Sequence, residues 1–155
     1  MTLDPAAFRT ACGNFATGVT VVTMRTATGQ PQGFTANSFT SVSLDPPLVL
    51  VCVDRQIAVH PVIAAADAWL VNILSADQED LSRRFATPDI DKFDGVAWGD
   101  GPLGTPKLRD CIAYLAVRPR SSHVAGDHDI FIGEAIAAEV SGGSPLIFFR
   151  GQYDL

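Results

Sequence analysis

The sequence predicts a mainly β fold, a small barrel of antiparallel strands with short helices. About seven short segments rich in strand-forming residues are separated by turns that contain Gly and Pro. These segments do not alternate regularly with long helices, as the strands of a doubly wound parallel sheet do. The chain has 155 residues, an ordinary size for one domain. We therefore expect residues 1–155 to form a single domain.

A helix is expected to begin at Asp4, where an N-cap residue is followed by Pro5 at the first helical position. Phe8, Cys12 and Phe15 follow at helical spacing and predict an apolar face.

Strands are predicted where β-branched and apolar residues cluster between turn signals. The Pro46-Pro47 pair predicts a corner, because proline cannot donate a hydrogen bond to a sheet, and the apolar run after it predicts a strand buried on both faces. The predicted strands are 19–24, 33–38, 48–53, 69–74, 112–118, 129–138 and 146–150.

Two further short helices are expected, one over residues 61–66 and one from Ser75 to Phe85, where Ser75 and Gln78 match a capping box. The stretch 92–109 is predicted to be mostly loop. It contains Gly-x-Gly-x-x-Gly at residues 99–104, the spacing of a dinucleotide-binding turn, but no predicted strand precedes it and Pro106 follows. We therefore interpret this match as a glycine-rich loop.

Charge and composition exclude several classes of protein. The formal net charge is −6 and the longest basic cluster is Arg83-Arg84, whereas nucleic-acid-binding proteins need clustered basic residues. No apolar run approaches the roughly 20 residues of a membrane helix. The first residues lack the basic and apolar regions of a signal peptide, so a cytoplasmic location is expected.

The three cysteines, Cys12, Cys52 and Cys111, are odd in number and far apart. We expect them to be reduced thiols that mostly fill the core. No serine lies at a nucleophile elbow, and His123 and His128 lack a third ligand beside them, so neither a nucleophilic triad nor a metal site is predicted.

The stretch Gly33–Ser43 is dense in short hydroxyl and amide side chains. In an extended chain Thr35, Asn37, Ser41 and Ser43 would share one face. Uncharged donors beside an apolar strand suit a planar polar ligand or a phosphate. A solvated strand with Ser/Thr turns would have the same composition. Similarly, His128 beside Asp127 either faces a pocket or is structural.

Several segments together resemble the short-chain flavin reductases, the NAD(P)H:flavin oxidoreductase components of two-component flavin-dependent monooxygenases. The similarity covers nearly the whole chain, and its motifs follow the order of that family. They are Phe15–Thr23, Gly33–Leu50, Val71–Leu74, Arg84–Ala86, Gly126–His128 with Ile132–Glu134, and Pro145-Leu146 with Arg150–Tyr153.

The resemblance implies an FMN-binding split β-barrel with antiparallel Greek-key strands, and a homodimer with FMN or FAD near its interface. It also implies hydride transfer from NADH, or from NADPH, to the flavin. Reduced flavin would then pass to a partner monooxygenase. Because the cofactor supplies the redox chemistry, such a site needs no general acid or nucleophile.

The resemblance also assigns roles to individual residues. His128 matches the histidine that faces the nicotinamide and is the candidate catalytic residue. The candidate flavin-binding residues are Thr35, Ala36, Asn37, Ser38, Ser41, Ser43, Val53, Asp54, Arg55, Gln56, His60, Arg84, Phe85, Lys92, Phe93 and Tyr153.

Two other functions remain open at this point. A barrel of the same kind could hold FMN tightly without reducing free flavin. A non-enzymatic module could bind another cofactor, such as haem, or serve in assembly.

Overall fold

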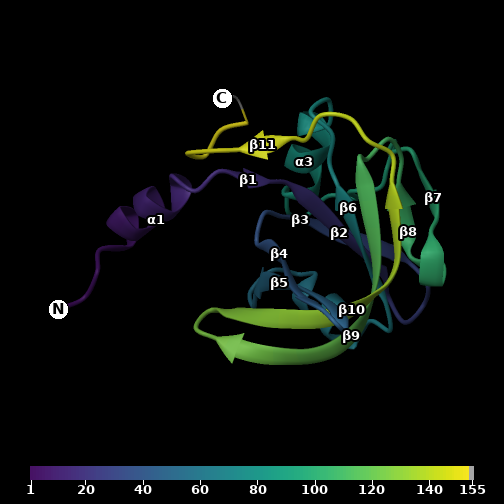
Figure 1. Cartoon of the computed structure of the whole chain (residues 1–155), viewed down its shortest axis with the longest axis horizontal. Helices are drawn as coiled ribbons and strands as arrows, with labels where there is room; N and C mark the ends of the chain where they lie inside the picture. Colours follow the sequence, from purple (N-terminus) through teal and green to yellow (C-terminus); the bar gives the residue numbers. More distant parts are fainter. Residues whose placement is uncertain (154–155) are drawn as a thin grey trace.

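The computed structural model describes residues 1–153, and strands dominate it (Figure 1). The helices are α1 (Pro5–Gly13), α2 (His60–Ala65) and α3 (Glu79–Phe85), with one 3₁₀ turn, η1 (Pro102–Gly104). The strands are β1 (Thr17–Gly18), β2 (Thr20–Arg25), β3 (Pro31–Ala36), β4 (Phe39–Leu44), β5 (Pro47–Asp54), β6 (Trp69–Ile73), β7 (Trp98–Asp100), β8 (Pro106–Leu108), β9 (Ala113–Ala125), β10 (His128–Val140) and β11 (Ile147–Phe148).

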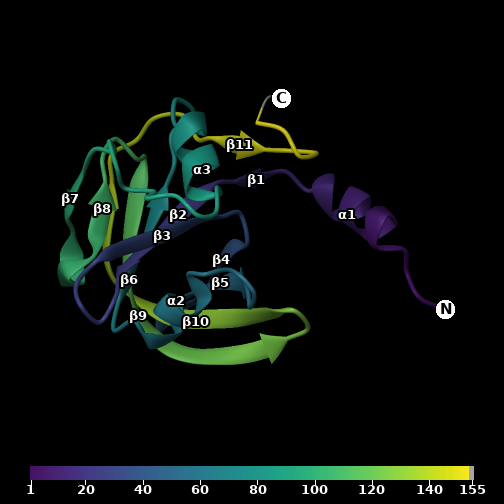
Figure 2. The ribbon, with the colours of Figure 1, turned by 180° about the vertical axis from the view of Figure 1, so that it is seen from behind.

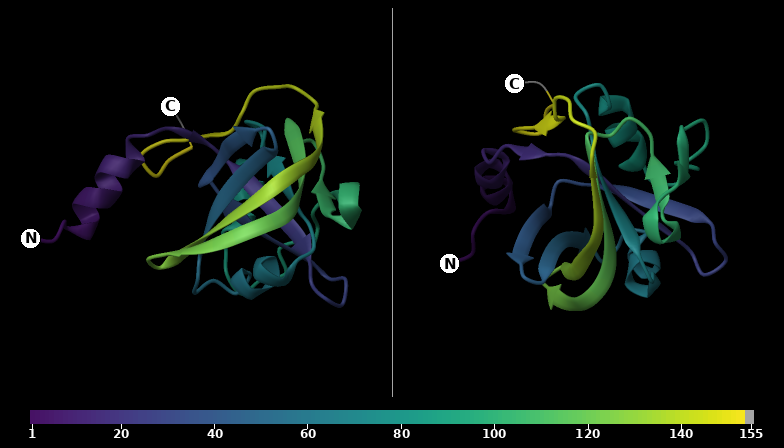
Figure 3. Two further views of the ribbon diagram at one scale, coloured as in Figure 1. Left: turned by 60° about the horizontal axis from the view of Figure 1, so that its bottom comes forward. Right: turned by 45° about the vertical axis from the view of Figure 1, so that its right-hand side comes forward.

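Seven strands form one sheet in the order β3-β2-β6-β9-β10-β5-β4, and every neighbouring pair is antiparallel. The sheet curls around its own interior (Figure 3). Two small pairs, β1 with β11 and β7 with β8, lie outside it. The prediction of a mainly β, antiparallel barrel with three short helices is confirmed. None of the helices within residues 1–153 is long and apolar enough to span a lipid bilayer.

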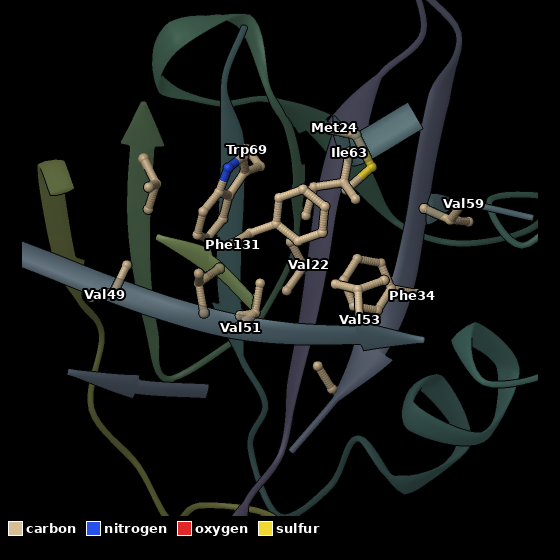
Figure 4. Packing of buried hydrophobic residues seen from close by; sticks show 13 residues of the cluster. Val22, Met24, Phe34, Val49, Val51, Val53, Val59, Ile63, Trp69 and Phe131 are labelled. Atoms are coloured by element: carbon tan, nitrogen blue, oxygen red, sulfur yellow. The ribbon is translucent and has the colours of Figure 1, made fainter. Parts of the chain in front are cut away.

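Two clusters of buried side chains form the core. Figure 4 shows the first, in which Phe131, Trp69, Val22 and Phe34 converge between the strands of the main sheet. Helix α2 adds Ile63 to this cluster (Figure 4). The second cluster lies against α3 and includes Phe85, Phe93, Leu70, Leu74 and Leu108.

Helix α1 extends away from the barrel (Figures 1 and 2). The Asp4 side chain accepts a hydrogen bond from the Ala7 amide, 3.3 Å away, so the predicted start is confirmed. The helix ends at Gly13 and buries no residue. The predicted apolar face is therefore not covered by any of residues 1–153, and Phe8 and Phe15 are exposed.

Several details differ from the expectations. Strand β5 alternates between buried and partly exposed residues, so the prediction that both faces are buried was wrong. Ser75 is not an N-cap. Helix α3 begins only at Glu79, although the Gln78 side chain does accept a hydrogen bond from the Ser75 amide at 2.9 Å. Residues 75–78 form a turn that precedes the helix.

The segment 92–109 was predicted to be loop, but it contains the short β7–β8 hairpin. The Gly-x-Gly-x-x-Gly match lies across this hairpin and η1, where no α-helix follows. Strands β9 and β10 are 13 residues each, longer than predicted. The exposed outer part of the β9–β10 hairpin carries polar residues, and their local sequence pattern is typical of a loop.

The cysteines are not all in the core. Cys111 is buried and burial raises the pKa of its thiol to about 11. Cys52 is partly buried, and Cys12 is exposed on α1. The prediction of core packing was wrong for Cys12, because its helix buries none of its residues within residues 1–153.

Candidate functional site

A cavity of about 470 Å³ opens between β3, α3 and two loops. Its size is within the usual range for small-molecule sites. The residues that line it come from four separate parts of the chain. They are Phe34 and Thr35 from β3, Gln56–Val59 from the loop after β5, Phe85 and Ala86 from the end of α3, and Pro88, Asp89 and Lys92 from the following loop.

Aromatic and aliphatic side chains form the base of the cavity. Phe34 and Val59 are buried, and Phe85 is 0% exposed. Gly33 allows β3 to pass close to α3, since a Cβ at this position would lie 3.0 Å from Cε1 of Phe85. The cavity floor is therefore rigid and apolar, which suits a flat ring system.

The polar groups lie around this floor. The Thr35 hydroxyl donates to the Ser82 carbonyl at 2.6 Å, so its orientation is set by α3. The Lys92 ammonium donates to the Gly33 carbonyl at 3.0 Å. Burial lowers the pKa of Lys92. Within residues 1–153 no carboxylate forms an ion pair with it. Lys92 is therefore a basic side chain at the cavity that has no carboxylate partner among the described residues.

Four of the predicted flavin-binding residues line this cavity: Thr35, Gln56, Phe85 and Lys92. Phe93 lies directly behind it, with its ring centroid 5.0 Å from that of Phe85 in an edge-to-face arrangement. These five residues come from distant parts of the sequence and are brought together by the fold.

The remainder of the hydroxyl-rich block is divided between two strands. Residues Thr35, Asn37, Ser41 and Ser43 do not share one face, because β3 ends at Ala36 and β4 begins at Phe39. The prediction of one continuous extended face was therefore wrong. Ala36 is buried, and Ser38 donates to the Cys52 carbonyl at 2.8 Å. Asn37 and Ser41 are exposed, and Ser43 is partly exposed on β4.

The predicted residues at the end of β5 have different environments. Val53 belongs to the core. Arg55 is exposed, and its guanidinium donates to the Gly126 carbonyl at 3.2 Å. Asp54 accepts a hydrogen bond from the Gln56 amide at 2.8 Å, which shapes the loop. His60, at the start of α2, contacts Asp129.

Arg84 and Tyr153 bind groups of the protein itself. The Arg84 guanidinium donates to the carbonyls of Asp91 and Lys92, both at 2.8 Å, and so holds the loop that carries Lys92. The Tyr153 hydroxyl lies 2.8 Å from that of Ser82, the residue whose carbonyl accepts from Thr35. Neither side chain lines the cavity. Both support elements that do.

His128 lies at the first position of β10, paired in register with Asp54. Its Nδ1 is 2.7 Å from the Asp127 carboxylate, and this hydrogen bond lowers the pKa of Asp127. The side chain of His128 is 42% exposed and does not line the cavity. It lies near the loop that forms one cavity wall, because the Arg55 amide donates to the Asp127 carbonyl at 3.0 Å.

The sequence predicted Phe85 but not the other apolar residues that line the cavity. Phe34 lies inside the hydroxyl-rich block, and its local pattern does not distinguish it from a core aromatic residue. Ile57, Ala58 and Val59 carry no distinguishing chemistry in the sequence. Asp89 adopts a φ of 61°, which sequence alone does not indicate.

The family model described as "Flavin reductase like domain" matches residues 12–154 of this chain. The relatives include FMN reductase (NADH) SmoA of Agrobacterium fabrum, which is 44% identical over 146 residues, 94% of this chain and 83% of SmoA. The solved structure of the NADH:FAD oxidoreductase SgcE6 of Streptomyces globisporus, in complex with NAD and FAD fragments, superposes with a TM-score of 0.92 at 39% identity. That match covers 100% of this chain and 96% of the other.

Some relatives are considerably longer. Stachydrine N-demethylase reductase subunit Stc3 of Rhizobium meliloti is 44% identical over 150 residues, which cover 97% of this chain and 65% of Stc3. A second protein of that strain is 47% identical, and the chain spans about half of its length, 48%. The match of the family model over most of the chain, together with these identities, shows that the chain belongs to the flavin reductase like domain family.

Proposed function

We propose that this protein is an NAD(P)H-dependent flavin reductase, which transfers hydride from NADH to FMN or FAD and supplies reduced flavin to a partner monooxygenase. The observation that carries the proposal is the cavity, where an apolar floor occurs together with a lysine that has no carboxylate partner within residues 1–153. The names of SmoA and SgcE6 support the reductase activity and the two flavins, and the name of Stc3, a reductase subunit of an N-demethylase, supports pairing with a second enzyme component.

The residues present fit a flavin. Ile57, which lines the cavity and is 36% exposed, offers apolar surface to an isoalloxazine ring over the buried Phe34 and Phe85, and Lys92 offers a positive charge for the phosphate. A bound flavin supplies the redox chemistry by accepting a hydride from the reduced nicotinamide. The protein's own contribution is to hold and orient the reactants, because proximity alone lowers such barriers substantially.

Individual residues have distinct tasks in this proposal. The Thr35 hydroxyl is held by its hydrogen bond to the Ser82 carbonyl and is therefore a polar group at a fixed position on the cavity edge. Arg84 holds the loop that carries Lys92. His128, at the start of β10, would contact the nicotinamide. NADH is the proposed donor in preference to NADPH, because an arginine usually accompanies recognition of a 2′-phosphate and few basic residues lie near this site.

The test is the rate of NADH oxidation by the purified protein, followed by absorbance with FMN, with FAD and without flavin. We expect a rate that saturates with added flavin and is small without it. Flavin retained through purification, with no turnover of added flavin, would instead support a tightly held cofactor that serves another substrate. A protein that binds neither flavin would contradict both functions.

Lys92→Met is expected to weaken FMN binding by roughly 10- to 100-fold, because hydrogen bonds to charged groups contribute about 1.5–3 kcal/mol. Binding of riboflavin, which has no phosphate, should stay unchanged. Fluorescence titrations of both ligands make the measurement. Lys107→Met is the matched control, since Lys107 is already paired with Glu139 at 2.6 Å and does not line this cavity. Equal losses for FMN and riboflavin would contradict a phosphate-binding role.

His128→Ala is expected to raise the KM for NADH about tenfold, the loss of one good contact, with little change in flavin affinity. Steady-state kinetics with varied NADH and a separate flavin titration distinguish the two effects. His123→Ala, on the same hairpin, removes a histidine that contacts only Ser121 among the described side chains and is the control. Unchanged kinetics in His128→Ala would remove His128 from the site.

The functional unit is proposed to be a cytoplasmic homodimer of single-domain chains. In the part of the chain that the structure describes, helix α1 has no buried residue. Phe15 and Leu44 are 79% and 96% exposed. A second copy that covers such side chains would remove apolar surface from water. Light scattering coupled to size exclusion should give twice the chain mass of 16.5 kDa, and a single-chain mass would contradict the dimer.

A further inference from the structure

Asp129, on β10, lies between the two ends of the loop that forms one wall of the cavity. That loop, residues 55–59, leaves β5 at Asp54 and enters α2 at His60. Oδ2 of Asp129 is 2.7 Å from Nε2 of His60, and its Oδ1 is 3.9 Å from Nε of Arg55. One carboxylate therefore lies beside Arg55, the first residue of the loop, and beside His60, the residue that follows the loop.

The Asp129 carboxylate is largely removed from solvent, with 15% of its side chain exposed and 18% of that of His60. Oδ1 is buried and has no hydrogen-bond partner among the described residues. A buried carboxylate oxygen without a donor is costly, so the nearby Arg55 guanidinium is the group that offsets this cost. Moving Arg55 away would leave the oxygen without compensation.

The His60 end of the loop is attached to the core. The imidazole packs against Phe131, with the ring centroids 5.7 Å apart, and the His60 amide donates to the Ile57 carbonyl at 3.1 Å. Val59, the preceding residue, is buried and lines the cavity. The contacts of His60 thus attach the end of the loop, next to Val59, to the core.

The Arg55 end is attached to the turn that precedes His128. The Arg55 amide donates to the Asp127 carbonyl at 3.0 Å, and its guanidinium donates to the Gly126 carbonyl at 3.2 Å. Gln56, the next residue, lines the cavity. The loop wall and the His128 turn are therefore connected through Arg55.

We propose that Asp129 is a positioning residue, which binds His60 and Arg55 and so holds the loop 55–59 in the position that binds flavin. This inference rests on the proposed function, because it takes the cavity to be the flavin site. Asp129 does not line the cavity itself, so it acts only through the loop. Nothing in the sequence resemblance assigns a role to Asp129.

The first test measures FMN affinity and kinetics for Asp129→Ala and Asp129→Asn. We expect Asp129→Ala to raise the dissociation constant and the KM for FMN about tenfold while kcat stays within twofold. Asp129→Asn keeps an oxygen that can accept from His60 but loses the charge beside Arg55, so its effect should be intermediate. Glu134→Gln is the matched control, because Glu134 is also on β10 but pairs with Arg120 at 3.4 Å.

A second measurement needs no ligand. Hydrogen exchange at the amides of Arg55 and Ile57, which donate to Asp127 and Asp54, should become about tenfold faster in Asp129→Ala. The amides of β2 and β6 should exchange as in the wild type, which shows that the barrel is intact. His60→Leu should give a similar change at Ile57, and combining it with Asp129→Ala should add little.

The two measurements separate this proposal from the function it rests on. Wild-type affinity for FMN in Asp129→Ala, or unchanged exchange at Arg55 and Ile57, would overturn the positioning role. A wild-type protein that binds no FMN would overturn the proposed function, and with it the flavin role of the loop. Faster loop exchange in Asp129→Ala would in that case still support Asp129 as the residue that holds the loop.

Discussion

Replacing Gly133 with alanine is expected to lower the free energy of unfolding by about 3 kcal/mol, the upper end of the usual cost of overpacking a core. Gly133 lies on β10, where the register with β9 shifts. A Cβ there would overlap Cγ1 of Val117 and would lie 3.0 Å from Cζ2 of Trp69 and 2.8 Å from the Arg118 carbonyl oxygen. The Arg118 oxygen belongs to the backbone of a central strand pair and cannot move aside cheaply.

The measurement is chemical denaturation followed by circular dichroism, with the midpoint compared at equal slope. Gly18→Ala is the matched control, because Gly18 is also in a strand and no atom lies within 4 Å of its Cβ position. That variant should be as stable as the wild type or slightly more stable. Equal stabilities for the two variants would show that β10 can shift away from Trp69.

Replacing Asn72 with alanine is expected to cost about 2–4 kcal/mol, since it removes several buried hydrogen bonds and leaves the Leu108 amide without its acceptor. Asn72, on β6, is completely buried. Its amide nitrogen donates to the Val21 carbonyl at 2.9 Å and to the Thr23 hydroxyl at 3.0 Å, and its oxygen accepts from the Leu108 amide at 3.0 Å. This side chain attaches the β7–β8 hairpin to the barrel.

Hydrogen exchange distinguishes a local effect from general destabilisation. In Asn72→Ala, exchange at the Leu108 amide should speed up more than the loss of global stability of the variant explains, because the hairpin loses a direct contact. Asn37→Ala, at an exposed position, is the control and should change stability by less than about 0.5 kcal/mol. Unaltered exchange at Leu108 would contradict the attachment role.

The Thr35–Ser43 block shows how much of a binding site local composition can predict. Its polarity indicated either a ligand site or a solvated strand, and the structure contains parts of both. Thr35 lines the cavity, whereas Ser38 binds the backbone of β5 and Asn37 and Ser41 are exposed. The bend between β3 and β4 separates these environments. Hydroxyl content alone cannot locate such a bend, because Ser and Thr are common in both strands and turns.

By itself, the sequence determined the fold class, the start of α1 and the approximate strand positions, because caps, prolines and strand-forming runs act over a few residues. Motifs in family order also determined the family. Only the tertiary structure decided which candidates meet at the cavity, that Arg84 binds backbone carbonyls, and that Asp129 joins the two ends of the loop. These contacts join residues far apart in the chain, so they depend on strand register and on the curl of the sheet, which no local pattern specifies.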